Sequence, residues 1–306
     1  MLVMNFFNTN YRDRINAMEL VINGLTKQYK KVTAVNDISI TLKSGVYGLL
    51  GANGAGKTTL MRMLCGVLRP TSGEVRYNGI DVSAEKYRDI IGYLPQELGY
   101  YPEFTAVEFL CYIACIKGLS NENAKMKSIN LLELVSLSDV AKKKIKTFSG
   151  GMKQRLGIAQ SLLNDPKVLI LDEPTAGLDP RERMRFRNLI SRLGEDRIAL
   201  LSTHIVSDIE SIARVILIIK NGCIIGSGTL SEILDTVQGK VFECSVDYET
   251  AQVLTQKHPL INIRDEGNVK QLRLIADKPP TESATSVNAT LEDLYAYCFS
   301  EEVYNA

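Results

Sequence analysis

The chain alternates between short apolar runs and longer stretches whose apolar residues recur at helical spacing. Runs rich in β-branched and aliphatic residues predict strands buried on both faces, at 46–50, 168–171, 198–201 and 215–219. Helical spacing is found at 57–68 and 151–163, and the capping box of Thr105 and Glu108 predicts the start of a further helix. This alternation over roughly the first 230 residues indicates an α/β fold with a mainly parallel sheet.

The pattern changes after Gly239. The tail contains strand-like runs at 241–246 and 272–275. It also contains helical stretches at 250–258 and from Thr290 onward, and a segment rich in Pro, Ser and Thr at 278–288. We therefore expect three parts: an N-terminal arm at 1–17, a main domain at 18–239, and a small α+β extension at 240–306.

The overall composition excludes several classes of protein. Apolar residues make up 45% and charged residues 23% of the 306 residues, as in ordinary globular chains. The 36 basic and 35 acidic residues leave a formal charge of +1, which gives no bulk attraction for nucleic acid or anionic lipid. The longest apolar run, at 109–116, is far shorter than the about 20 residues that cross a membrane.

The cysteines and the N-terminus argue against a zinc-binding protein and against a secreted protein. None of the six cysteines forms a C-x-x-C pair or a cluster with either of the two histidines, so a structural zinc site is not expected. Scattered cysteines of this kind are typical of reduced thiols in an intracellular protein. Residues 1–17 are polar and irregular and lack the apolar core of a secretory signal.

The strongest chemical signal is a glycine-rich loop between a predicted strand and a predicted helix. The loop matches G-x-x-x-x-G-K-[ST], and the flanking strand and helix favour a phosphate site over an ordinary solvated turn. Glycines let successive N–H groups point at phosphate oxygens, next to the positive end of the helix. Lys57 can reach the β- and γ-phosphates of a nucleotide, and the Thr58 hydroxyl can ligate Mg²⁺. The residues expected to hold the phosphates are Gly51, Asn53, Gly54, Gly56, Lys57, Thr58 and Thr59.

Two carboxylates follow another buried strand. Asp172 and Glu173 come directly after the apolar run at 168–171, at the strand end where ligands bind in open α/β sheets. Asp172 is suited to hold Mg²⁺, and Glu173 is placed to polarise an attacking water. An acidic pair is a weak signal alone, but together with the lysine-bearing loop it is strong.

A third motif points to a family. Phe148-Ser149-Gly150-Gly151-Met152 resembles the signature sequence of ATP-binding cassette (ABC) proteins, usually written LSGGQ. Four further residues are similar to family marks in the family's order: Tyr29 to the adenine-stacking aromatic, Gln96 to the Q-loop glutamine, Asp179 to the D-loop aspartate and His204 to the switch histidine. The resemblance covers roughly residues 18–238. Position 148 is Phe instead of Leu, and position 152 is Met instead of Gln.

The resemblance implies a P-loop cassette that binds ATP and Mg²⁺ and hydrolyses ATP. It implies that Thr58, Gln96 and Asp172 hold the metal. It also implies that Lys57, Glu173 and His204 are catalytic, with Lys57 and His204 at the phosphates and Glu173 at the attacking water. Two such cassettes pack head to tail, so Ser149, Gly150 and Gly151 would bind the partner's nucleotide and Asp179 would contact the partner. A helical insert at about 97–147 would receive a cytoplasmic helix of a permease.

These observations predict the ATPase subunit of a membrane transporter at the cytoplasmic face of the membrane. The permease would be a separate chain, and the second cassette is expected to be an identical copy. The C-terminal extension resembles those of bacterial exporters, so we expect export. The alternative is an ABC ATPase that acts on ribosomes or nucleic acid, which the near-zero charge and the short stretch between Gln96 and Ser149 disfavour. A scaffold without activity is disfavoured because Lys57, Asp172, Glu173 and His204 are all present.

Overall fold

The computed structural model describes residues 18–203, 205–267 and 269–303, so the expected arm at 1–17 and the switch residue His204 lie outside the described residues. Its centre is a six-stranded sheet in the order β10-β9-β3-β8-β7-β6. The neighbours from β9 to β6 pair in parallel, and β10 pairs antiparallel at one edge. These strands are β3 (Gly45–Leu50), β6 (Ile91–Leu94), β7 (Val168–Asp172), β8 (Ile198–Ser202), β9 (Val215–Lys220) and β10 (Cys223–Gly228). The mainly parallel α/β sheet is thus confirmed.

The central strands are buried on both faces because their side chains alternate between two apolar cores. In β7, Val168 and Ile170 pack into one core and Leu169 and Leu171 into the other. Every residue of β3, β7 and β8 is buried. This two-sided burial explains why the strands are continuous apolar runs rather than alternating ones.

A second sheet, which the apolar pattern does not single out, covers one face. It is antiparallel in the order β2-β1-β4-β5. Its strands are β1 (Glu19–Tyr29), β2 (Val32–Lys43), β4 (Ser72–Tyr77) and β5 (Ile80–Asp81), and its inward residues share a core with α2 (Lys57–Leu64). Helix α2 is shorter than the expected 57–68, because Gly66 adopts a φ of 69° just past its end.

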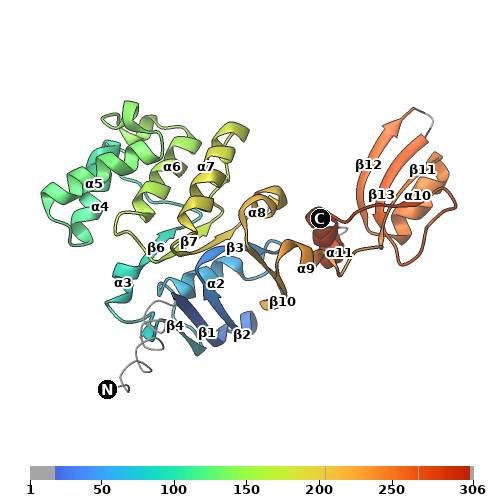
Figure 1. Ribbon diagram of the computed structural model, residues 1–306, viewed down its shortest axis with the longest axis horizontal. Coiled ribbons are helices and arrows are strands. Elements are labelled where there is room, and N and C mark those ends of the chain that lie inside the picture. Colours follow the sequence, from blue (N-terminus) through green and yellow to red (C-terminus); the bar gives the residue numbers. More distant parts are fainter. Residues whose placement is uncertain (1–17, 204, 268, 304–306) are drawn as a thin grey trace, which may run out of the picture.

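Helices cover the opposite face (Figure 1). They are α4 (Ala106–Ile116), α5 (Asn121–Leu134), α6 (Gly150–Ser161), α7 (Pro180–Leu193), α8 (Val206–Ile212) and α9 (Leu230–Leu234), with the 3₁₀ turns η1 (Ser138–Val140) and η2 (Ile145–Thr147). The short helix α3 (Tyr87–Ile90) packs instead into the core of the second sheet. The predicted capping box is present: Thr105 Oγ1 accepts from the Glu108 N–H, and Glu108 Oε2 accepts from the Thr105 N–H. Among the described residues, no helix combines the length and apolarity needed to cross a bilayer.

The C-terminal extension is a small antiparallel sheet with a helix on one side. The sheet order is β12-β13-β11-β14. Its elements are β11 (Val241–Val246), α10 (Tyr248–Lys257), β12 (Leu260–Glu266), β13 (Val269–Ile275) and β14 (Thr285–Ser286). It has an apolar core of its own, built around Phe242, Leu254 and Leu272. β12 is not a predicted strand, and most of its residues are exposed.

The last helix, α11 (Leu291–Val303), belongs by its packing to the larger part of the molecule. Leu291, Leu294 and Phe299 join the core beneath α8 and α9 rather than the core of the small sheet. Figure 1 shows α11 between that sheet and α9. Buried Asp293 joins α11 to β13 by accepting from Arg273 Nε at 2.9 Å. Burial, the largest single influence, would raise the pKa of Asp293, but the hydrogen bonds from Arg273 and Thr290 and the charge of Arg273 together leave that pKa below its ordinary value.

Candidate active site

The loop between β3 and α2 is shaped by its glycines. Gly54 and Gly56 have φ angles of 82° and 104°, which residues with a Cβ rarely adopt. A Cβ on Gly56 would lie 2.3 Å from the carbonyl oxygen of Ala34, and one on Gly51 would lie 2.5 Å from that of Ile219. Gly56 is also the N-cap of α2, so the loop leads directly to the N–H groups at the start of that helix.

Lys57 lies back across this loop. Its Nζ donates to the carbonyl oxygens of Gly51 at 2.6 Å and Ala52 at 2.9 Å. Lys57 is only 8% exposed, so its ammonium group is held beside the loop rather than spread into solvent. The loop therefore has both the backbone shape and the fixed positive charge that phosphate oxygens require.

Asp172 is buried at the carboxyl end of β7. It is 1% exposed and lies opposite Ser202, the last residue of the parallel strand β8. Ser202 Oγ donates to Asp172 Oδ1 at 2.6 Å. Among the described residues, Asp172 Oδ2 has no hydrogen-bond partner. A buried carboxylate oxygen of this kind is costly unless a ligand or cation meets it.

Glu173 has a strained backbone. Its φ is 52°, in the left-handed region, which costs a non-glycine residue on the order of 1–3 kcal/mol. Its N–H donates to the carbonyl oxygen of Ser202 at 3.2 Å and to Ser202 Oγ at 3.1 Å. Its carbonyl oxygen accepts from Gln154 Nε2 at 3.3 Å. Bonds from two separate elements thus hold Glu173 in a conformation that an unconstrained residue would avoid.

These parts surround one cavity of about 300 Å³. Its walls come from the glycine loop, the start of α2, the end of β7 and the segment after β6. It is lined by Ala34, Asn53, Gly54, Gly56, Lys57, Thr58, Thr59, Gln96, Asp172 and Glu173. All of these except Ala34 are residues that the sequence predicts, although they come from three distant stretches of the chain.

Two ionisable groups that interact with Asp172, the Tyr93 phenol and the Cys65 thiol, stay neutral around pH 7. Burial raises the pKa of Tyr93 to about 12, with further contributions from Cys65 and Asp172. Burial, followed by the charge of Asp172, also raises the pKa of the Cys65 thiol. Neither side chain therefore adds negative charge beside Asp172.

The donor set of the cavity fits Mg²⁺. Thr58, Gln96 and Asp172 present a hydroxyl, an amide oxygen and a carboxylate to the same space, and hard oxygen ligands are those that Mg²⁺ prefers. The buried Asp172 Oδ2, which has no partner among the described residues, is available for a metal-bound water.

The predicted signature motif lies at the start of α6. Ser149 is the N-cap of α6, and its Oγ accepts from the Met152 N–H at 3.2 Å. A Cβ on Gly150 would meet nothing within 4 Å, whereas one on Gly151 would lie 2.3 Å from Glu182 Oε2. The start of the helix is therefore open to solvent at Gly150 and closely packed at Gly151.

Comparison with known proteins agrees with this geometry. A family model described as ABC transporter matches residues 35–176. The uncharacterized ABC transporter ATP-binding protein YxlF of Bacillus subtilis is 41% identical over 239 residues, which cover 78% of this chain and 80% of that protein. This chain belongs to the family of ABC transporter ATP-binding proteins. Its family and its P-loop α/β fold are thus as predicted, and ATPase is its enzyme class.

One further relative aligns with more of this chain than YxlF does, and another similar protein has a solved structure. The linearmycin resistance ATP-binding protein LnrL of Bacillus subtilis is 34% identical over 283 residues and covers 91% of each chain. The dimeric structure of a post-hydrolysis state of the cassette MJ0796, bound to ADP and Pi, superposes with a TM-score of 0.64 at 25% identity. That match covers 69% of this chain and 98% of the other, so the shared fold is that of the cassette.

The two departures from the ABC signature both concern apolar packing. Phe148 is buried and contributes to the core, so an apolar anchor is retained where the family usually has Leu. Met152 packs partly against the same core. Its backbone N–H still serves the cap of Ser149, so the local helix start does not depend on a Gln at this position.

Tyr29 and Asp179 do not line the cavity. Tyr29 ends β1, is 46% exposed and has Lys27 Nζ 5.3 Å from its ring centroid, so the ring is accessible for stacking. Asp179 is the N-cap of α7, and its Oδ1 accepts from the Glu182 N–H at 2.8 Å. Nothing is described for His204, so its assignment remains an expectation.

Three residues of the site were not singled out from the sequence. Ser202 bonds to both carboxylate residues, Gln154 bonds to Glu173, and Ala34 lines the cavity. Ser202 directly follows the predicted strand at 198–201, just before His204, and Gln154 lies one turn into the signature helix. Those positions are the signal that could have identified two of them, whereas Ala34 carries no chemical signal.

Proposed function

We propose that this chain is the ATP-hydrolysing subunit of a membrane exporter. In this proposal it binds ATP and Mg²⁺, works in a head-to-tail dimer with an identical cassette, and drives a separate permease from the cytoplasmic face of the membrane. Names of relatives support export: one is a linearmycin resistance protein, and the bacitracin transport ATP-binding protein BcrA of Bacillus licheniformis is 43% identical over 203 residues. LnrL also aligns through most of the C-terminal extension, since it covers 91% of the chain.

The observation that carries the proposal is the single cavity shared by Lys57, Gln96, Asp172 and Glu173. Lys57 and the N–H groups of the glycine loop would bind the β- and γ-phosphates. Thr58, Gln96 and Asp172 would hold Mg²⁺, which neutralises charge on the phosphates. Phosphoryl transfer to water needs positioning and charge neutralisation more than covalent chemistry.

Glu173 is the residue placed to act on the attacking water. Its strained backbone conformation and its backbone hydrogen bonds to Ser202 and Gln154 fix the position from which its side chain extends. The bond from Gln154 also links Glu173 to the signature helix of the same chain. We propose that Glu173 orients and polarises the water, and that His204 contacts the γ-phosphate.

The other predicted contacts serve the partner cassette. Ser149, Gly150 and Gly151 would bind the phosphates held by the second chain, Asp179 would contact that chain, and Tyr29 would stack on the adenine. Residues 97–147, which include α4 and α5, would receive a helix of the permease. Tyr101, Phe104 and Tyr112 form an aromatic cluster on α4 and before it, with ring centroids 5.1 to 5.8 Å apart, which would suit such a helix.

The proposed activity is tested by the substitution Glu173→Gln, which keeps the shape of the side chain and removes its charge. With Mg²⁺ present, the variant should bind ATP as the wild type does and hydrolyse it at less than about 1% of the wild-type rate. Glu195→Gln, at an exposed position, is the matched control and should hydrolyse normally. Unchanged hydrolysis by Glu173→Gln would remove this residue from its role.

The transport role is tested by purification of the tagged chain from detergent-solubilised membranes of its own cells. Co-purification of a polytopic membrane protein in a fixed ratio is the expected result. Co-purification of ribosomes or DNA without such a protein would favour the alternative, a cassette ATPase that acts on ribosomes or nucleic acid.

A further inference from the structure

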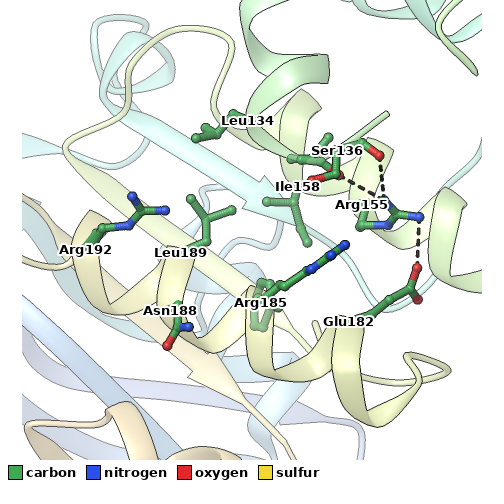
Figure 2. A pocket seen from close by; sticks show the side chains of 11 residues that line it. Leu134, Ser136, Arg155, Ile158, Glu182, Arg185, Asn188, Leu189 and Arg192 are labelled. Carbon is green, nitrogen blue, oxygen red and sulfur yellow. Dashed lines mark hydrogen bonds and ion pairs between the residues drawn. The ribbon is translucent and has the colours of Figure 1, made fainter. Parts of the chain in front are cut away.

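A second cavity lies away from the nucleotide site. It has a volume of about 390 Å³ and is enclosed by the end of α5, the middle of α6 and one face of α7 (Figure 2). None of its lining residues lines the nucleotide cavity. Its volume is within the range of small-molecule sites, which is about 300–1,000 Å³.

The floor of this cavity is apolar. Val135, Ile158, Phe186 and Leu189 line it and are all buried. Covering the part of this floor that still faces the cavity would stabilise a complex, in proportion to the apolar area removed from water. The floor therefore favours a ligand with an apolar body.

Two arginines without partners border the floor. Arg185 and Arg192 project from α7 on either side of Leu189 in Figure 2. Among the described residues, neither guanidinium group takes part in a hydrogen bond or an ion pair. By contrast, Arg183 and Arg187 on the same helix face the buried carboxylate of Asp208, at 3.9 and 3.8 Å. Arg183 and Arg187 thus share one carboxylate on the side of α8, whereas Arg185 and Arg192 have none on the side of the cavity.

A third arginine forms a fixed wall. Arg155 Nη1 donates to the carbonyl oxygens of Val135 at 3.1 Å and Ser136 at 2.8 Å, and Nη2 lies 2.9 Å from Glu182 Oε1. These bonds tie the end of α5, α6 and α7 together around the cavity. Because Glu182 balances the charge of Arg155, the net charge that faces a ligand comes from Arg185 and Arg192.

We propose that this cavity binds an amphiphilic anion, namely a phosphate monoester or carboxylate joined to a short apolar body. The guanidinium groups of Arg185 and Arg192 would bind the anionic oxygens through paired N–H donors, and the apolar body would cover the floor. An inorganic anion would leave the floor in water, and a neutral apolar molecule would leave both cations uncompensated. The ligand chemistry is shared by free metabolites and by membrane lipids.

Calorimetric titration of the full chain with octyl phosphate, below its micelle concentration, tests the proposal. One molecule should bind per chain, and octanoate should compete with it. Arg185→Ala and Arg192→Ala should each weaken binding about tenfold, which corresponds to about 1.4 kcal/mol. Lys125→Ala removes an exposed charge of α5 that does not line the cavity, and it should leave the affinity unchanged.

Three outcomes would overturn the proposal. Equal binding of octanol or octyltrimethylammonium would show unspecific apolar binding, and equal binding of inorganic phosphate would show that the floor plays no part. Unchanged affinity in both arginine variants, with their fold verified by circular dichroism, would place any binding elsewhere. If the proposal holds, sedimentation with phosphatidic acid vesicles that requires Arg185 identifies a lipid as the source, and binding of octyl phosphate without such sedimentation identifies a free metabolite.

Discussion

The starts of α2 and α6 are both suited to an anion, but they differ in what surrounds them. At α2, a lysine, two carboxylate residues and a glutamine enclose a cavity. At α6, Ser149 and Gly150 are exposed, and space is open beside Gly150. The first region groups the side chains that would bind the phosphates and the metal of a nucleotide. The second has a helix N-terminus without such groups, as our proposal expects of a half-site that a second cassette completes.

The two regions also differ in backbone strain. The α2 loop needs left-handed angles at Gly54 and Gly56, and Glu173 is strained opposite it. The start of α6 is an ordinary capped helix, in which Ser149 accepts from the Met152 N–H. Strain concentrated at α2 suits a site that performs chemistry, whereas the relaxed start of α6 suits one that only binds.

The largest expected effect comes from the enclosed region. Lys57→Ala removes the fixed charge beside the loop and should lower ATP turnover by about 100-fold or more. Lys125→Ala, at an exposed position of α5, should have no effect. Steady-state phosphate release measures both, and near-normal turnover in Lys57→Ala would mean that the cavity at α2 is not the catalytic one.

A smaller effect is expected from closing the open space at α6. Gly150→Ala adds a methyl group where no atom lies within 4 Å, so it should not disturb the fold of the monomer. It should still lower turnover by about 10- to 100-fold, because a phosphate from the partner would be displaced. Gly99→Ala, where a Cβ also meets nothing, is the control. Equal turnover in the two variants would argue against an anion at the start of α6.

The smallest expected effect comes from Ser149, and it distinguishes a role in capping α6 from a role in binding phosphate. Ser149→Ala and Ser120→Ala each remove an N-cap hydroxyl that accepts a backbone N–H, at 3.2 and 3.4 Å. Each should lower the free energy of unfolding by about 1 kcal/mol in urea titrations. Turnover should fall about tenfold in Ser149→Ala alone, since only that hydroxyl would also bind a phosphate. Loss of turnover in both variants would mean that stability, not binding, is the cause.

The nucleotide cavity was largely predictable because its signals are local. The chemical groups of the loop from Gly51 to Thr59, and those of Asp172 and Glu173, are each contiguous in the sequence. Buried parallel strands place both sets at one edge of the sheet. The hydrogen bonds of Ser202 to Asp172 and of Gln154 to Glu173 were not predictable, since they depend on which strands and helices become neighbours. The left-handed backbone of Glu173 likewise has no signal in its residue type.

The C-terminal extension shows the opposite case. Its helices and two of its strands follow from apolar spacing, but spacing does not tell which core an apolar face will join. α11 follows the extension in sequence, yet Leu294 and Phe299 pack with α8 and α9. β12 was missed because its second half is polar and exposed, as in many strands at the edge of a sheet.

The central claim is that one chain encloses a nucleotide and a second chain seals it with the start of its α6. Sedimentation of Glu173→Gln with ATP and Mg²⁺ tests this most directly, because this variant should bind the nucleotide without consuming it. The account predicts a species of twice the 34.0 kDa chain mass with ATP, a single chain without it, and a single chain again when Gly150→Ala is added. A saturated Glu173→Gln protein that stays a single chain would contradict the account.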